Sequence, residues 1–243
     1  MTARNAVVVG AVCAGLALAL AGCGSEEHPD AGTNGVAKLS ASKIERKARD
    51  AAGKAVAVRL SGTVVVSKGR TYKLNMRLRE DGGFGHLVTK GSTFRLLRID
   101  EDLYLKADAD FWAGQKGQQA EGTSVARKLD DKYVKVPEGD PAYKQLSGFT
   151  DMKVLMDGLL GLHGKLAKGD RGQVGGTRTV RITGDDGAGG SLDVSLEGTP
   201  YPLRLQRAGG AGTLRLTAWN KTFDLQAPDE DQVVDYGRQI TAG

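Results

Sequence analysis

Apolar and polar residues alternate with a period of two along most of the chain beyond residue 55. The clearest example is the segment TYKLNMRLR at positions 71–79, in which every second residue is apolar. Successive side chains of a β-strand point to opposite faces, so this alternation predicts a strand with one buried face and one wet face. Asp81-Gly82 follows it, a dipeptide typical of tight hairpin turns.

The same period predicts about ten or eleven strands in two groups. They lie at 56–66, 72–79, 84–89, 93–99, 103–106 and 133–136, and then at 177–183, 191–197, 202–207, 213–219 and 222–226. Short turns containing Gly and Asp join most of them, which favours antiparallel pairing in one sheet. One face of that sheet is expected to be wet and the other to be covered by helices. Residues 107–132 break the pattern and predict an irregular or partly helical excursion.

The period changes to 3.6 in two places, and each predicts a helix. The first helix is expected over 42–52, where the letters SKIE form a capping box in the first turn. The second is expected over 149–160, with Thr150 as its cap and an apolar stripe along one side. Asp140-Pro141 is typical of a further helix start, because Asp caps free amides and Pro fits the first turn.

The first 22 residues follow neither period. Arg4 precedes an uncharged apolar run at positions 6–21, AVVVGAVCAGLALALA. This run has the length of the apolar region of an export signal and is short for a membrane-spanning helix. An uncleaved anchor helix is the alternative, but the small residues that end the run argue against it. Residues 1–22 are therefore interpreted as a signal peptide for export.

The run ends in Leu20-Ala21-Gly22-Cys23, which resembles the lipobox of bacterial lipoproteins. In that class the cysteine thiol carries a diacylglyceryl group and becomes the first residue of the mature chain. The resemblance implies lipidation at Cys23 and attachment to the extracytoplasmic face of the cell membrane, which two acyl chains hold stably. Residues 23–37 are polar and are expected to form a flexible tether, leaving 38–243 as a single domain.

The charges are interspersed, with 34 basic and 29 acidic residues and a formal net charge of +5. This is the surface of an exported soluble domain and lacks the clustered basic footprint of a nucleic-acid-binding protein. Cleavage before Cys23 removes Cys13 with the signal, so the mature chain holds one cysteine and no internal disulfide.

The sequence carries no recognisable catalytic, metal or cofactor motif. The letters SASK at 40–43 fit the S-x-x-K pattern of acylating serines, but the partner motifs S-D-N and K-T-G are missing. The three histidines are far apart in sequence, and the paired carboxylates at 101–102 and 130–131 are typical of turn corners. The chain is therefore interpreted as a non-enzymatic protein without a metal or other cofactor.

The order of lipobox, tether, helix, antiparallel meander, helical interruption and second meander resembles the LppX/LprAFG lipoproteins of actinobacteria. Local matches are Leu103-Tyr104-Leu105 with the downstream Phe111-Trp112, and the C-terminal letters TAWNK and LQAP. The resemblance spans most of residues 38–235. It implies an α+β fold, a predominantly antiparallel, unclosed β-half-barrel of about 10–11 strands with 2–3 helices on its concave face, similar to LolA and LolB.

Members of that family enclose a cavity for acyl chains. The resemblance therefore implies a carrier or holder of lipids or lipoglycans in the cell envelope. The candidate lining lies on the apolar faces of the strands within 72–89 and of the helix at 149–160. Its residues are Leu74, Met76, Leu78, Phe84, Met152, Leu155, Met156 and Leu159. Three of them are methionines, which are flexible and polarizable and so suit a ligand of variable shape.

Alternating leucines and a methionine stripe are equally typical of a closed core. In that case the chain is a surface-tethered interaction or regulatory protein without lipid cargo. Lys73, Arg77 and Arg79, on the wet face of their strand, would then dock the partner. The volume of any cavity between sheet and helices discriminates between the two hypotheses.

Overall fold

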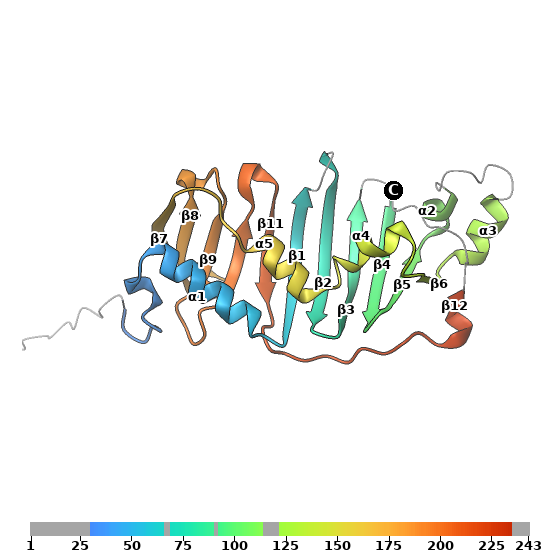
Figure 1. Cartoon of the computed structure of the whole chain (residues 1–243), viewed down its shortest axis with the longest axis horizontal. Helices are drawn as coiled ribbons and strands as arrows, with labels where there is room; N and C mark the ends of the chain where they lie inside the picture. The colour runs from blue at the N-terminus through green and yellow to red at the C-terminus, as the bar shows by residue number, and fades with distance from the viewer. Residues whose placement is uncertain (1–29, 66–68, 90–91, 114–121, 235–243) are drawn as a thin grey trace, which may run out of the picture. The chain divides into compact units, whose positions relative to one another are not determined.

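The computed structural model describes residues 30–65, 69–89, 92–113 and 122–234. The chain divides into two units, Met1–Ala31 and Gly32–Gly243, and the second contains the sheet and helices labelled in Figure 1. The predicted signal peptide and Cys23 lie outside the described residues.

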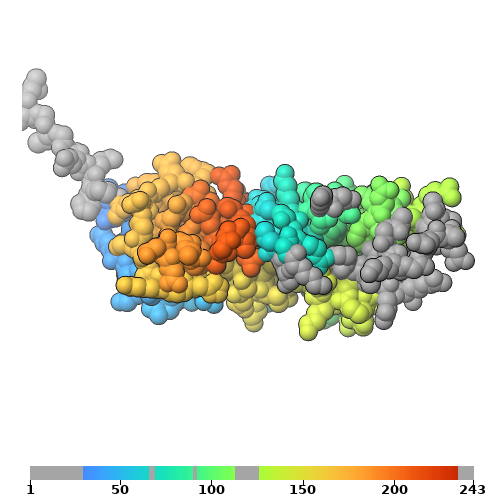
Figure 2. Space-filling model, turned by 90° about the horizontal axis from the view of Figure 1, so that it is seen from above, coloured from blue at the N-terminus to red at the C-terminus, as the bar shows by residue number. Residues whose placement is uncertain are grey.

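The described part of the second unit forms one unclosed sheet of twelve strands, in the spatial order β12-β6-β5-β4-β3-β2-β1-β11-β10-β9-β8-β7. Every neighbouring pair is antiparallel except β6 and β12, which run parallel. β11 pairs with β1, so the last long strand lies beside the first, as Figure 2 also shows. The strands are β1 (Ala57–Val65), β2 (Thr71–Arg79), β3 (Gly82–Thr89), β4 (Ser92–Ile99), β5 (Asp102–Ala107), β6 (Tyr133–Val136), β7 (Leu166–Val174), β8 (Thr177–Gly184), β9 (Ser191–Ser195), β10 (Pro202–Gln206), β11 (Gly212–Thr217) and β12 (Val233–Val234).

Five α-helices are present in the described ranges, and three of them lie across one face of the sheet (Figure 1). α1 packs over β7 to β10, and α5 and α4 continue the cover towards β4. α2 and α3 contact each other near the β6 end. The helices are α1 (Ala41–Gly53), α2 (Ala109–Ala113), α3 (Gly122–Leu129), α4 (Pro141–Ser147) and α5 (Met152–Leu159).

The core lies between the helices and the sheet face that they cover. Strand register places one row of side chains across that face, namely Leu60, Met76, Gly85, Leu96 and Leu105. The four apolar side chains of this row are each at most 1% exposed. Because every second residue of each strand points to this face, the period of two in the sequence is the direct cause of the buried layer.

The predicted fold class is confirmed, and the element count differs in four places. β7 was not predicted, because an exposed edge strand of sequence LAKGDRGQV has no apolar alternation. β12, which has only two residues, was not predicted either. The strand expected at 222–226 does not form, and these residues belong to an extended segment without strand pairing. The interrupting segments hold α2, α3 and α4, so the helices number five and not two or three.

The helix caps differ from the sequence prediction in two of three places. The N-cap of α1 is Ser40, two residues before the expected cap at Ser42. Glu45 does not close a capping box and instead accepts a hydrogen bond from the Leu162 amide (3.3 Å). α5 is capped by Asp151, whose carboxylate accepts from the Val154 amide (2.9 Å). The predicted cap at Asp140 is confirmed, with its carboxylate 2.7 Å from the Ala142 amide.

Thr150, predicted as the α5 cap, has another role. It is fully buried, and its hydroxyl oxygen accepts a hydrogen bond from Arg98 Nε (3.2 Å). A second guanidinium nitrogen of Arg98 donates to the Thr150 carbonyl oxygen (3.2 Å). Arg98 lies on β4, so this pair of bonds ties the connection between α4 and α5 to the sheet.

We predict that Gly85→Ala destabilises the fold by about 1–3 kcal/mol, the usual cost of overpacking a well-packed core. A methyl group at Gly85 would clash with the Asn75 carbonyl oxygen, the nearest atom, and would lie 2.6 Å from the sulfur of the fully buried Met76. Urea unfolding measures the change.

The matched control is Gly172→Ala on β7, where the nearest atom is Thr179 Oγ1 at 3.8 Å. Its stability is expected to change by less than about 0.5 kcal/mol. Equal losses for the two variants would contradict the close packing of β2 on β3.

Candidate functional site

A line of aromatic rings runs along one rim of the covered sheet face. Tyr72 of β2 lies 5.8 Å from Phe149 and 6.4 Å from Phe94 of β4, measured between ring centroids. Phe94 in turn lies 5.8 Å from Phe111 of α2, whose ring is 5.1 Å from that of Trp112. The sequence contains only five phenylalanines, and three of them are in this line. The rim is therefore the aromatic centre of the molecule.

These rings border a cavity of about 800 Å³, called here the rim cavity. Its apolar lining consists of Tyr72, Val88, Phe94, Leu105, Phe111, Leu146 and Phe149. Its polar lining comes from strand ends and from exposed positions of α2 and α4, and consists of Thr63, Arg70, Thr71, Lys73, Thr89, Ser92, Asp110 and Gln145.

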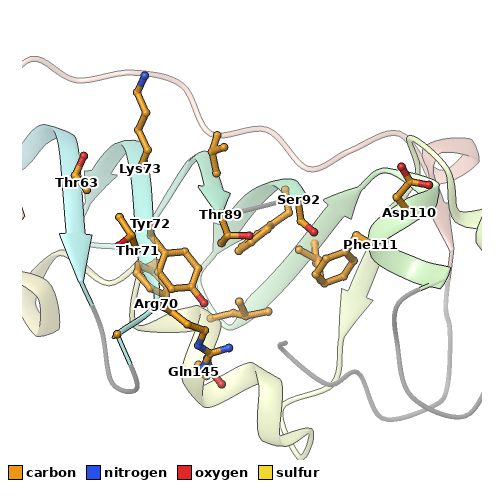
Figure 3. Close-up of a pocket in the computed structure, with 16 residues that line it drawn as sticks. Thr63, Arg70, Thr71, Tyr72, Lys73, Thr89, Ser92, Asp110, Phe111 and Gln145 are labelled. Carbon is orange, nitrogen blue, oxygen red and sulfur yellow. The ribbon is translucent and has the colours of Figure 1, made fainter.

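Figure 3 shows how the side chains of the rim cavity are placed. The ring of Tyr72 lies near Arg70 and Gln145, and that of Phe111 lies towards Ser92, while Lys73 extends away from the other labelled side chains. Apolar walls with polar groups at the mouth are the usual composition of a site for an amphipathic small molecule.

The eight residues predicted to line a cavity lie elsewhere. Leu74, Met76 and Leu78 are buried in the core, and so are Met152 and Met156 of α5. None of them is in the lining of the rim cavity.

Of the other three predicted residues, two pack against the core and one lies on the opposite face of the sheet. Leu155 and Leu159 pack half-buried against the same core. Phe84 lies on the opposite sheet face, with its ring 5.4 Å from that of Phe223. Alternation identified the covered face correctly for the β2 residues, but it does not tell where along a long sheet the cover is incomplete.

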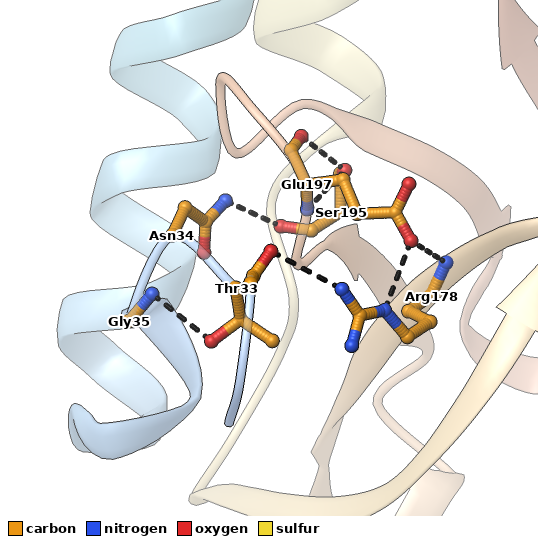
Figure 4. A network of polar contacts seen from close by, with 7 residues as sticks. Thr33, Asn34, Gly35, Arg178, Ser195 and Glu197 are labelled. Atoms are coloured by element: carbon orange, nitrogen blue, oxygen red, sulfur yellow. Dashed lines mark hydrogen bonds and ion pairs between the residues drawn. The ribbon is translucent and has the colours of Figure 1, made fainter. Parts of the chain in front are cut away.

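The segment that precedes α1 is docked on β9 (Figure 4). The Asn34 side-chain amide donates to the carbonyl oxygens of Ser195 and Gly198, each at 3.0 Å. The Arg178 guanidinium donates to the Gly32 carbonyl oxygen at 3.1 Å. The packed chain thus begins before residue 38, the expected start of the domain, and residues 23–29 of the predicted tether lie outside the described part.

A second pocket lies on the sheet face opposite the helices. The segment 218–232, called here the strap, runs from β11 to β12 along one edge of the strands (Figure 1). A pocket of about 520 Å³, the strap pocket, is lined by β1 to β4 and β6 and by strap residues Asp224, Leu225 and Gln226. Phe84 is part of this lining.

Arg79 fastens the strap to β2. One guanidinium nitrogen donates to the Phe223 carbonyl oxygen at 2.9 Å, and the rest of the group forms an ion pair with Asp81. The hydrogen bond from Arg79 holds the pKa of the Asp81 carboxyl below its ordinary value.

The described ranges contain no group of three or more His, Cys, Asp or Glu residues placed to hold a metal ion. Among the helices of the same ranges, none combines the length and the apolar character needed to cross a bilayer.

We predict that Asp81→Asn lowers the free energy of unfolding at pH 7, and that this loss becomes smaller as the pH falls below about 4. A carboxyl whose pKa is lowered by folding stabilises the protein above its unfolded pKa, near 3.9, and loses that contribution as the pH falls through the folded value. Urea unfolding at a series of pH values from 7 downwards measures this difference. Asp50→Asn on the exposed side of α1 controls for the change in net charge, and an Asp81→Asn loss that does not change with pH would contradict the assignment.

Solved structures with a similar fold were found, while no protein-family model and no curated protein sequence matches the chain. LprF from Mycobacterium bovis aligns with a TM-score of 0.50 and 13% identity, covering 77% of this chain and 96% of that one. The lipoprotein LppX from Mycobacterium tuberculosis aligns with a TM-score of 0.44 and 16% identity, covering 75% and 96%. An uncharacterized protein from Thermus thermophilus aligns with a TM-score of 0.39 and 11% identity, covering 80% of this chain and 98% of that one. The alignment with LprF shows that the chain has the type of fold that the sequence resemblance predicts.

Proposed function

We propose that the mature chain is a membrane-anchored, non-enzymatic carrier or holder of lipids or lipoglycans, and that an acyl chain of its cargo occupies the rim cavity. The observation that supports this most is the cavity itself, with about 800 Å³ of space beside the rings of Tyr72, Phe94 and Phe149. Pockets for small ligands span about 300–1,000 Å³, so this volume is sufficient for a lipid chain.

The lining supplies the driving force. Each buried methylene group contributes about 0.8 kcal/mol, so a ten-carbon stretch gains about 8 kcal/mol before the cost of ordering the chain. Aromatic walls give a large apolar contact area without many rotatable bonds to immobilise. Arg70, Thr71 and Ser92 at the mouth provide donors for the oxygens of a headgroup.

A longer chain would extend from the rim cavity beneath α5. There the lining would include the two buried methionines Met152 and Met156 and the half-buried Leu155 and Leu159, all of which pack against the sheet. Methionine side chains adapt to a new neighbour at low cost, which supports a core that opens for cargo. Met152→Trp should then reduce the length of chain that is retained.

Anchoring is the second part of the proposal. Lipidation of Cys23 would attach the chain to the outer face of the membrane through two acyl chains, the number at which anchoring becomes stable. Eight residues lie between Cys23 and the docked Gly32, and a fully extended chain from one to the other spans about 30 Å. The domain would thus remain close to the bilayer from which it takes its cargo.

We predict that Gln145→Trp lowers the fraction of protein that carries lipid several-fold, because an indole at this position fills the rim cavity. Native mass spectrometry of protein purified from a membrane-containing host measures the occupancy. Lys144→Trp is the matched control, since Lys144 is exposed on the same helix and is not part of the lining.

Equal occupancy in the two variants, or no lipid on the unmodified protein from any preparation, would contradict the proposal. The second result would favour the surface-tethered interaction protein without lipid cargo.

We also predict that Cys23→Ala abolishes incorporation of radiolabelled palmitate and releases the protein from the membrane or leaves its signal uncleaved. The reason is that no other residue of LAGC can form the thioether. Labelling at full level in the variant would contradict the anchor. Cys13→Ala, within the predicted signal, is the control and should be labelled normally.

A further inference from the structure

The sheet face opposite the helices carries two arginines in an unfavourable pair. Strand register places Arg59 of β1 directly opposite Arg77 of β2, and on the neighbouring strands it places Arg95 of β4 opposite His86 of β3. Like charges directly opposite each other destabilise a sheet, because their side chains lie about 5 Å apart at the β-carbons. All four residues line the strap pocket.

Several other cations on this face are paired with carboxylates. Arg204 pairs with the buried Asp193 at 2.6 Å, Lys106 with Asp131 at 2.8 Å, and Lys135 with Asp102 at 2.7 Å.

The pocket arginines differ. Among the described residues, no ion pair within 4.0 Å involves Arg59, Arg77 or Arg95. Arg95 is close enough to Asp131 to contribute to its lowered pKa without pairing with it. Asp224 of the strap is the one carboxylate in the described lining, so the positive charge of the pocket exceeds its negative charge.

The pocket is also built to orient these groups. Arg59 Nε donates to the Asn75 side-chain oxygen at 3.0 Å, which fixes the guanidinium plane. The strap covers the pocket on one side, held there by the Arg79 bond to Phe223 and by packing of Phe223 on Phe84. Three guanidinium groups around an open pocket of about 520 Å³ form a cationic site.

We propose that the strap pocket binds a phosphate group, either free or as an ester, through Arg59, Arg77 and Arg95. The planar guanidinium forms two parallel hydrogen bonds with phosphate oxygens, and a phosphate has enough oxygens for several such contacts. The volume leaves room for a small hydroxylated group next to the phosphate, which Asn75 and Gln226 can hydrogen-bond.

This site is independent of the proposed lipid cargo. The pocket arginines lie on the face opposite the helices, whereas Tyr72 and Phe94 lie on the covered face. Phosphate binding and acyl-chain binding should therefore be separable, and failure of one leaves the other intact.

The test uses the mature chain with Cys23→Ser, so that no acyl anchor is present. It is titrated calorimetrically with inorganic phosphate and with glycerol phosphate at low ionic strength. Arg77→Gln is expected to weaken binding about tenfold, the effect of losing one charge-assisted contact. Asp224→Asn is expected to strengthen it, because it removes the opposing charge. Arg49→Gln, exposed on α1, makes the same change in net charge as Arg77→Gln and should leave binding unchanged.

Unfolding in urea shows whether Arg77→Gln folds normally. Its midpoint without phosphate should be equal to or above that of the unmodified chain, because the substitution removes a like-charge pair. Phosphate should raise the midpoint of the unmodified chain and not that of Arg77→Gln.

Vesicles identify the source of the phosphate. Sedimentation with phosphatidylglycerol vesicles that depends on Arg77 assigns the site to a lipid headgroup, while binding of glycerol phosphate alone assigns it to a free ester. Absence of binding in both arms, or equal losses in Arg77→Gln and Arg49→Gln, would overturn the proposal.

Discussion

The structure depends on burying one apolar face of a twelve-strand sheet beneath short helices. Twelve strands at about 4.8 Å spacing give a sheet about 50 Å wide, whereas α1, α5 and α4, with 13, 8 and 7 residues, are about 20, 12 and 10 Å long. α1 lies over β7 to β10, and α5 and α4 continue the cover towards β4. The rim cavity lies between α4 and the aromatic rings of β2, β4 and α2.

The two faces of the sheet carry different chemistry because each strand alternates. The covered face contributes leucine, methionine and aromatic side chains, and the other face contributes arginines and lysines with their carboxylate partners. Close packing on the covered face needs glycine at position 85, beside Met76. On the other face the strap closes over arginines that lack such partners among the described residues. A single antiparallel sheet thus separates an apolar cavity from a cationic pocket.

Alternation made the fold predictable, since strand positions and the buried face follow from a period of two. β7 was missed because charged side chains such as Lys168 and Arg171 keep an edge strand from pairing with another chain. These charges also interrupt the apolar alternation by which a strand is recognised. The capping box failed because Glu45 bonds the distant Leu162 amide, a tertiary contact that local spacing does not encode. The cavity residues were missed for the same reason. Phe94 and Phe149 look like ordinary core positions until the end of α4 is known.

The central claim is that acyl chains occupy the rim cavity, and quenching of tryptophan by brominated lipid chains tests it most directly. Trp112 is buried with its ring 5.1 Å from the cavity residue Phe111, whereas Trp219 stacks on Tyr201 at the start of the strap. Each is observed alone in the variant that replaces the other by Phe. The account predicts that brominated chains quench Trp112 and leave Trp219 bright. Equal quenching of both, or of neither, would contradict it.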